Sequence, residues 1–317
     1  MTIAPSPYLT QYLQPIAALL ARDDVTDIYI NAPGEVWAET IGGTIERYEE
    51  PAIDEASLWR LARQVASLSH QGINREHPLL SAILPDGSRV QIVAPPATRG
   101  AMAVAIRRHV VADRRLTDYD WSTLARARDV PAAPVETDPA SQLAAAVRAR
   151  KTILVSGGTS TGKTTFLNAV LSEIPANERL IVIEDTPELQ LRHANAVGLV
   201  AVRNALGEAR IGTEDLLQAS LRMRPDRIIL GELRGPEAMT FLRAINTGHP
   251  GSISTIHADT PDRAVEQLAL LVLQTGTRLT RADILLYVHQ IIDVFVQLER
   301  RDGRRQITEV RWTDRTR

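Results

Sequence analysis

The sequence contains no cysteine and few aromatic residues. Without cysteine, disulfide bonds and thiolate metal sites are excluded, which fits a reducing compartment. Phenylalanine, tryptophan and tyrosine together make up only 4% of the 317 residues, and the formal net charge is -2. A protein that acts directly on nucleic acid needs a basic groove or stacking aromatic side chains, and this composition favours neither. We therefore expect no direct nucleic-acid binding.

Long apolar runs are also missing. No window approaches 18 uninterrupted apolar residues, and residues 1–7 lack the basic segment and apolar stretch of a secretory signal. We expect a cytoplasmic protein whose association with a membrane can only be peripheral. The composition is that of a globular protein, with 44% hydrophobic and 23% charged residues. The length of the chain predicts two domains.

Residues 1–112 predict a small α+β domain. Short apolar runs alternate with Gly, Pro and Asn turns, as in a hairpin sheet, and apolar residues spaced by three and four predict an amphipathic helix over 54–70. Residues 129–139 hold three prolines, which favours extended chain, so a linker is expected over 113–140. The expected strands of the first domain lie at 27–30, 36–39, 89–93 and 103–106.

Residues 141–317 alternate apolar, β-rich runs with helical windows. This alternation predicts a mostly parallel sheet covered on both faces, which is an α/β core. Runs at 293–298 and 305–310 flank Asp302-Gly303, which predicts a final hairpin. Earlier strands are expected at 152–156, 180–184, 226–231 and 252–256, and helices at 163–173, 213–223, 236–247 and 261–274.

A complete phosphate-binding loop follows the first strand of this core. Its pattern is G-x-x-x-x-G-K-[ST], in which glycines let successive backbone N–H groups surround phosphate oxygens at a helix N-terminus. Lys163 is expected to neutralise the β- and γ-phosphates, Thr164 to offer a hydroxyl to Mg²⁺, and Thr165 to add a phosphate contact. The predicted nucleotide-binding residues are Gly157, Gly158, Thr159, Ser160, Thr161, Gly162, Lys163, Thr164 and Thr165.

Acidic residues follow the next expected strand. Glu184 and Asp185 end the run at 180–184, and Glu188 lies three residues beyond Asp185. Carboxylates at the carboxyl end of a central strand face the ligand crevice of an open α/β sheet, where they can hold Mg²⁺ or its water molecules. The same residues can instead form a capping cluster for a turn at Pro187, and the sequence leaves both interpretations open.

One more acidic residue and two histidines complete the candidate catalytic set. Glu232 ends a second apolar run and is the candidate for polarising the water that attacks the γ-phosphate. Gly231 stands where many P-loop proteins place a Mg²⁺-linked aspartate. His249 and His257 flank a short strand, and a neutral imidazole can donate to a phosphate or to a catalytic carboxylate, which favours His257 as a reporter of the γ-phosphate. A structural role is the alternative for both histidines.

Four segments, in this order, resemble the motifs of a known family. They are the loop at 157–165 and the runs 182–189, 221–238 and 246–258. These segments resemble the Walker A, Asp box, Walker B and His box of the secretion ATPases of the type II/type IV superfamily, closest to the conjugal-transfer and type IV secretion branch. The resemblance implies a RecA-like P-loop core, ATP and Mg²⁺ as cofactors, and a cytoplasmic homo-hexameric ring.

The N-terminal half resembles the nucleotide-facing N domain of the same family, at 27–34 and 87–96 and at Ile106-Arg107-Arg108. By this resemblance Arg89 and Arg107 are candidate phosphate contacts. Arg108 is the alternative to Arg107, because neighbouring side chains on a strand point to opposite faces. Solvated charge at a strand end is the alternative for each arginine.

Two loop positions depart from the commonest form of the family. Ser160 replaces a glycine and Thr161 replaces a serine. Both replacements are small and polar, so nucleotide binding is expected to survive.

The resemblance predicts an ATP-hydrolysing hexameric motor for a type IV secretion or conjugal-transfer apparatus at the cytoplasmic face of the inner membrane, with inner-membrane components as its partners. Closure of the N domain over the nucleotide, about the linker, is the expected motor stroke. The alternatives are a nucleotide-gated docking or assembly factor of the same machinery, a pilus or type II secretion ATPase, and a motor acting directly on nucleic acid. The catalytic candidates are Lys163, Glu232, Glu188, His257, Arg89 and Arg107, and the metal candidates are Thr164, Glu184 and Asp185.

Overall fold

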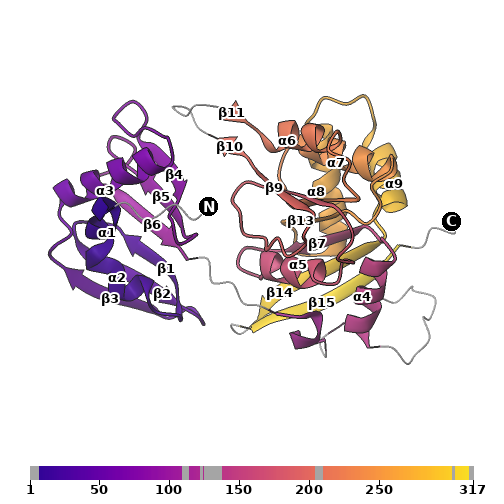
Figure 1. Ribbon diagram of the computed structural model, residues 1–317, viewed down its shortest axis with the longest axis horizontal. Helices are drawn as coiled ribbons and strands as arrows, with labels where there is room; N and C mark the ends of the chain where they lie inside the picture. The colour runs from indigo at the N-terminus through magenta and orange to yellow at the C-terminus, as the bar shows by residue number, and fades with distance from the viewer. Residues whose placement is uncertain are drawn as a thin grey trace. The chain divides into compact units, whose positions relative to one another are not determined.

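The computed structural model describes residues 7–108, 114–121, 124, 138–203, 210–301 and 304–313. The chain divides into two compact units, one formed by residues 1–111 with 202–210 and the other by residues 112–201 with 211–317 (Figure 1). The predicted domain boundaries stay a prediction, and most of the predicted linker and the Asp302-Gly303 turn lie outside the described residues. Within the described residues, no helix is both long and apolar enough to cross a membrane.

The N-terminal unit is built on a six-stranded sheet in the order β3-β2-β1-β6-β5-β4, in which every neighbouring pair is antiparallel. This arrangement confirms the predicted α+β domain. The strands are β1 (Val25–Ile30), β2 (Gly34–Thr40), β3 (Ile45–Glu50), β4 (Leu79–Ile83), β5 (Arg89–Val93) and β6 (Ala103–Arg107). The helices are α1 (Pro7–Leu13), a 3-10 turn (Gln14–Ile16), α2 (Ala17–Leu20) and α3 (Glu55–Leu68).

Helix α3 packs on this sheet through a single apolar face. Leu58, Leu61 and Val65 recur at spacings of three and four, and all three are buried in one cluster with Ile28 of β1. Asp54 caps the helix by accepting a hydrogen bond from the Ser57 backbone N–H at 2.6 Å, a contact that typically contributes about 1 kcal/mol. The amphipathic pattern and the cap together explain why the predicted helix forms where it does.

The second unit is a seven-stranded sheet in the order β15-β14-β7-β13-β12-β8-β9. All pairs are parallel except β14 with β15, which confirms the predicted α/β core and its final hairpin. The strands are β7 (Ile153–Gly157), β8 (Leu180–Glu184), β9 (Ala196–Val200), β12 (Arg227–Leu233), β13 (Ile253–Ile256), β14 (Val294–Arg301) and β15 (Arg304–Trp312). The helices are α4 (Pro139–Arg148), α5 (Lys163–Leu171), α6 (Thr213–Ser220), α7 (Glu237–Asn246), α8 (Pro261–Leu273) and α9 (Arg281–Ile291), and a 3-10 turn spans Leu116–Asp118. The short strands β10 (Val202–Arg203) and β11 (Arg210–Ile211) form a separate two-stranded sheet.

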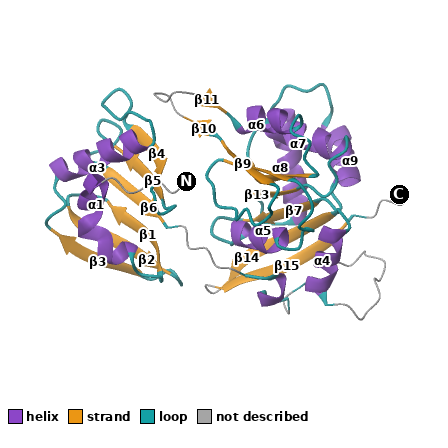
Figure 2. Cartoon of the chain, in the orientation of Figure 1, coloured by secondary structure: helices purple, strands orange, loops and turns teal. Residues whose placement is uncertain are grey.

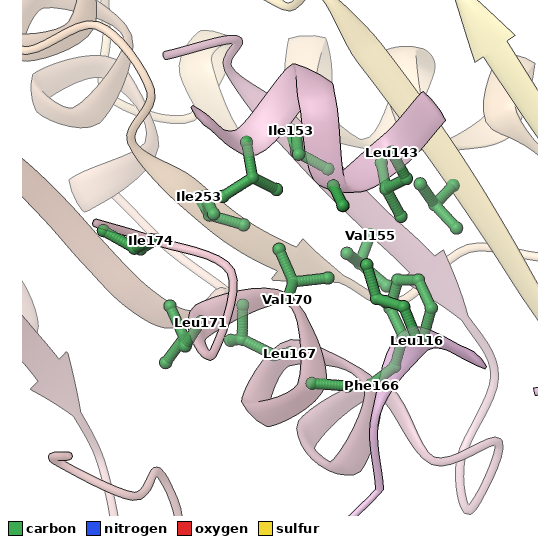
Figure 3. Close-up of a cluster of buried hydrophobic side chains, with 14 of the residues drawn as sticks. Leu116, Leu143, Ile153, Val155, Phe166, Leu167, Val170, Leu171, Ile174 and Ile253 are labelled. Atoms are coloured by element: carbon green, nitrogen blue, oxygen red, sulfur yellow. The ribbon is translucent and has the colours of Figure 1, made fainter. Parts of the chain in front are cut away.

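The sheet lies between helices (Figure 2). Apolar side chains on both of its faces pack against them. Ile153 and Val155 of β7 face the cluster that contains Phe166 and Val170 of α5 (Figure 3). Leu154, between them, lies in the cluster on the other face, because successive side chains of a strand point to opposite sides. Strand β7 is therefore fixed from both faces, and the loop that follows it starts from a rigid position.

Three features of the second unit were not predicted. Leu116 and Tyr119, which we assigned to the linker, are buried in its core, and the Tyr119 ring stands edge-on to Phe166 with the centroids 5.1 Å apart. Strand β9 has an exposed or half-buried side chain at every position, so it lacks the apolar run of a central strand. Helix α9 carries apolar residues around most of its surface, including the exposed Leu286, and so shows no clear helical period.

Candidate active site

The loop between β7 and α5 has the backbone that anion binding requires. Ser160 and Gly162 take left-handed conformations, with φ of 61° and 89°. That conformation costs a non-glycine residue such as Ser160 about 1 kcal/mol, whereas glycine adopts it freely. Gly162 is the N-cap of α5, and Thr161 Oγ1 donates to the Gly158 carbonyl at 2.9 Å. The loop therefore curls over the first turn of α5, and the N-terminus of a helix is where an anion is expected to bind.

A second part of the same unit approaches this loop. A Cβ atom added at Gly162 would lie 2.8 Å from Cδ of Arg305, and one added at Gly157 would lie 2.8 Å from the Leu298 carbonyl oxygen. Leu298 and Arg305 belong to the β14–β15 hairpin. Gly157 is thus required by the close approach of the hairpin backbone and Gly162 by its left-handed conformation, and the hairpin brings the Arg305 side chain to the N-terminus of α5.

Lys163 points into the curl of the loop. Its Nζ donates to the carbonyl oxygens of Gly157 and Gly158 at 2.8 and 3.0 Å and lies 3.3 Å from Nδ1 of His257. Burial lowers the pKa of the Lys163 ammonium, because the charged form loses hydration. The lysine is therefore held by atoms of the loop and of the segment after β13, in the place where phosphate oxygens are expected.

Glu232 lies at an irregularity in strand β12. The register between β12 and β13 shifts between Leu230 and Leu233, as at a β-bulge, which re-aims the side chains in between. Thr255 Oγ1 donates to the Gly231 carbonyl at 2.8 Å and so fixes this segment against β13. A Cβ at Gly231 would lie 3.3 Å from Cγ of Glu184. A side chain at position 231 would therefore press on Glu184, which would have to shift slightly.

His257 connects the catalytic candidates Lys163 and Glu232. Its Nε2 lies 2.8 Å from Oε1 of Glu232, while its Nδ1 faces the Lys163 ammonium. An ammonium only donates and a carboxylate only accepts, so the tautomer that suits both neighbours carries its proton on Nε2, although the contact with Oε1 is not a hydrogen bond. Burial lowers the pKa of His257, and the charges of Lys163 and Arg234 lower it further, against the opposing effect of Glu232. The imidazole is therefore neutral at pH 7.

The second histidine has a different environment. His249 Nδ1 lies 3.2 Å from the Pro225 carbonyl oxygen, before β13, whereas His257 follows that strand. This contact corresponds to the structural alternative that the sequence left open for His249.

Asp185 and Arg234 extend the polar cluster beyond Glu232. Arg234 Nη2 donates to Oε2 of Glu232, and Arg234 Nη1 donates to Oδ2 of Asp185 at 3.3 Å. Asp185 also accepts a hydrogen bond from the Thr213 hydroxyl, at the first residue of α6, at 3.0 Å. The contacts run without a break from α6 to Lys163, by way of Asp185, Arg234, Glu232 and His257.

Glu184 has the contacts of a capping residue. It is 6% exposed, and its Oε1 accepts hydrogen bonds from the backbone N–H groups of Glu188 and Leu189 at 2.7 and 2.9 Å. These contacts are those of the capping alternative, and a role of Glu184 in holding Mg²⁺ stays a prediction. Glu188 lies in the loop that Glu184 caps, and its negative charge is close enough to help raise the pKa of Arg234.

The predicted arginines lie in the N-terminal unit. Arg89 and Arg107 are direct cross-strand neighbours on β5 and β6, and Arg107 also lies opposite Asp27 of β1, with its Nε 3.2 Å from Asp27 Oδ1. Arg108 instead donates to the backbone carbonyls of Arg22 and Val25. Between the two alternatives, Arg107 keeps the more open guanidinium, with 49% of its side chain exposed. A role in phosphate binding stays a prediction for Arg89 and Arg107.

Comparison with known proteins decides the family. A model of the type II/IV secretion system protein family matches residues 10–300. The chain belongs to this family. It is 39% identical to the type IV secretion system protein VirB11 of Bartonella quintana, over 94% of this chain and 91% of that protein. It is also 39% identical to the type IV secretion system protein PtlH homolog of Bordetella bronchiseptica, over 96% of this chain and 94% of that protein.

Solved structures agree with this membership. The VirB11 ATPase of the Brucella suis type IV secretion system is 36% identical and covers 96% of this chain, with a TM-score of 0.51. The pilus retraction motor PilT, at 21% identity and a TM-score of 0.63, shows the fold alone. The predicted secretion ATPase of the type IV branch and the predicted RecA-like core with a smaller N-terminal domain are confirmed.

Three residues that shape the site were not assigned roles from the sequence. Arg234 lies two residues after Glu232, and Glu237 three residues further on, so both were visible only as parts of a motif. Arg305 is far away in the sequence and comes from the hairpin. The signal that could have singled out Arg234 was its nearness in the sequence to Glu232, since a long arginine side chain two residues away can reach the carboxylate.

Proposed function

We propose that residues 157–165 bind the phosphates of ATP and that Glu232 polarises the water that attacks the γ-phosphate, giving ADP and phosphate. The single observation that carries this assignment is the contact of Lys163 and Glu232 with the two nitrogens of one imidazole, His257. A phosphate-binding cation and a catalytic base must act on the same phosphoryl group. Lys163, the N-terminus of α5 and the arginines then stabilise the charge that develops on it.

The residues present also fit Mg²⁺. Magnesium in nucleotide sites is usually held by substrate phosphates and one or two protein oxygens rather than by a full protein cage. Consistent with this, the described part of the chain contains no cluster of three or more acidic or histidine side chains with metal-site geometry. Thr164, at the start of α5, and Asp185, at the end of β8, would hold the ion, and Glu184 less so because of its backbone contacts. Bound Mg²⁺ supplies charge neutralisation of the phosphates.

At the level of the assembly, we propose a homo-hexameric motor of a type IV secretion or conjugal-transfer apparatus, docked peripherally on the cytoplasmic face of the inner membrane. Support comes from the VirB11 and PtlH relatives, which are named as type IV secretion system proteins. The VirB11 ATPase of Brucella suis was solved in complex with sulphate, a tetrahedral anion like a phosphoryl group. Closure of the N-terminal unit over the nucleotide, with Arg89 and Arg107 toward the phosphates, is the proposed stroke.

A nucleotide-gated docking or assembly factor is the second candidate function. The observation that favours it is the state of the two key side chains: Lys163 is bonded to the carbonyls of its own loop, and Glu232 contacts both Arg234 and His257. Lys163 and Glu232 would have to leave these partners before ATP is hydrolysed. Hydrolysis would then be slow, and the ATP-bound state would be long-lived.

The two candidates are separated by steady-state ATP hydrolysis with Mg²⁺ across a range of protein concentrations. We expect turnover per chain to rise with protein concentration, because a ring assembles by mass action, and to disappear when Mg²⁺ is chelated. Size-exclusion chromatography with light scattering should show the assembly at the concentrations where turnover rises. Tight ATP binding without turnover at any concentration would instead support the docking factor.

The state of His257 predicts a pH dependence. Protonation of Nδ1 would place a positive charge beside the Lys163 ammonium and break that contact. Because the pKa of His257 is lowered, its imidazole is neutral at pH 7. The fall of kcat on the acid side of the pH profile must therefore lie below the ordinary histidine pKa of about 6.5. We expect kcat to be constant from pH 8 to that value and to fall below it.

The measurement is kcat against pH for the wild type and for His257→Gln, with His193→Gln as the control. His193 makes a backbone contact to Ile174 and should leave the profile unchanged. An acid limb that persists in His257→Gln would show that another group is responsible.

A further inference from the structure

Arg234 is the residue of the cluster that touches the proposed catalytic base most directly. Its two terminal nitrogens are divided between Glu232 and Asp185, and 47% of its side chain is exposed. Its charge is near enough to lower the pKa of both Lys163 and His257. The guanidinium thus lies beside the groups that are expected to surround the γ-phosphate.

The turn that carries Arg234 is held by a buried acid. Glu237, 4% exposed, accepts hydrogen bonds on Oε1 from the backbone N–H groups of Arg234 and Gly235, at 2.7 and 2.8 Å. Arg234 follows the last residue of β12, and its side chain reaches back to Glu232. The backbone is therefore fixed while the long arginine side chain can reorient.

The charges explain why Arg234 rests on Glu232. Glu232 Oε2 accepts a hydrogen bond from Arg234, whereas Oε1 lies 2.8 Å from His257 Nε2 without making a hydrogen bond, so Arg234 occupies the one oxygen that is hydrogen-bonded. A carboxylate held in this way is less able to accept a hydrogen bond from water. A γ-phosphate carries more negative charge than one carboxylate, and arginine binds phosphate with two parallel hydrogen bonds.

We propose that Arg234 is a γ-phosphate sensor within the same chain: it masks Glu232 in the nucleotide-free state and exchanges that carboxylate for the γ-phosphate of a bound nucleoside triphosphate. The exchange frees Oε2 of Glu232 for the attacking water. A nucleoside diphosphate lacks the third phosphate and leaves Arg234 on Glu232. The proposal rests on the proposed function, and it adds that the site distinguishes ATP from ADP through this one side chain.

The test compares affinities for ADP and for an ATP analogue with nitrogen bridging the β- and γ-phosphorus atoms, both with Mg²⁺, by isothermal titration calorimetry. Arg234→Ala is expected to weaken binding of the analogue by at least about tenfold, the size of one charge-assisted hydrogen bond, and to leave ADP binding within about threefold. The kcat should fall by about 100-fold, as on loss of one donor to the developing charge. Arg234→Lys should restore part of the affinity for the analogue and part of kcat, because lysine keeps the charge but cannot form the paired hydrogen bonds.

Arg148→Ala is the matched control, since Arg148 pairs with Glu173 on the surface of α4. The proposal is overturned if Arg234→Ala keeps the preference of the wild type for the analogue over ADP, even if kcat falls. It is also overturned if ADP and the analogue weaken equally, because that is the pattern of a merely structural role. Binding of the analogue by the wild type, and its loss in Lys163→Ala, tests the proposed function separately.

Discussion

Replacement of Glu232 by glutamine is expected to lower kcat for ATP hydrolysis by about 10³-fold and to leave ATP affinity nearly unchanged. Glutamine keeps the shape of the side chain and can still contact His257, but it cannot accept a proton or strongly polarise water. General-base catalysis contributes about 10² to 10⁴ in rate. Because Glu232 lies in β12 and Lys163 starts α5, the elements proposed to bind phosphate remain intact in this variant.

The measurement is kcat from phosphate release, with ATP affinity from equilibrium binding. Glu173→Gln, at the exposed ion pair with Arg148, is the control and should behave as the wild type. Lys163→Ala should show the other pattern and lose ATP binding together with turnover, because its ammonium is the cation inside the loop. A Glu232→Gln variant that retains more than a tenth of the wild-type kcat would exclude Glu232 as the base.

Replacement of Arg227 by alanine is expected to destabilise the protein by about 3–5 kcal/mol, the range for removal of one partner of a buried ion pair. Arg227 begins β12 and is fully buried, and it forms two parallel hydrogen bonds to Glu178, at 2.7 and 2.9 Å. Its Nη1 also donates to the Gly251 carbonyl at 3.3 Å. The hydrogen bonds from Arg227 lower the pKa of Glu178, and without them the buried carboxylate keeps only the half-exposed Arg150, whose Nη2 lies 3.4 Å away. Strand β12, which carries Glu232, depends on this pair.

Urea unfolding should report the effect as a lower midpoint at a similar slope. Arg148→Ala, which breaks an exposed pair, is the control and should cost no more than about 1 kcal/mol. The double change Arg227→Met with Glu178→Leu should recover most of the stability, since it leaves no buried charge. If Arg227→Ala proves no more destabilising than the control, the buried pair does not anchor β12.

The phosphate-binding motif and most of the central strands could be predicted from short stretches of sequence, because the interactions that define them join residues close together in the chain. The loop at 157–165 is recognisable since its glycines and Lys163 act within nine consecutive residues between a strand and a helix. The central strands β8 and β12 were found because they are buried on both faces and read as unbroken apolar runs. Strand β9 lies at the sheet edge and carries no such run, so it was missed.

The assignments of the acidic residues needed tertiary structure. Glu184 and Asp185 are adjacent and look equivalent in the sequence, but Glu184 turns to two backbone N–H groups of its own loop and Asp185 turns to Arg234 and Thr213. Adjacent side chains leave a strand in opposite directions, and what each one meets depends on elements remote in the chain.

The sequence by itself determined the α/β core with its glycine-rich loop, the family, and the identity of the residues at the strand ends. Only the tertiary structure decided which of those residues meet: that one imidazole joins Lys163 to Glu232, that Arg234 covers the same carboxylate, and that Arg305 reaches Gly162. The reason is physical. Backbone propensity and burial act over a few neighbouring residues, whereas hydrogen bonds between charged side chains depend on the packing of parallel strands that the chain visits in a different order.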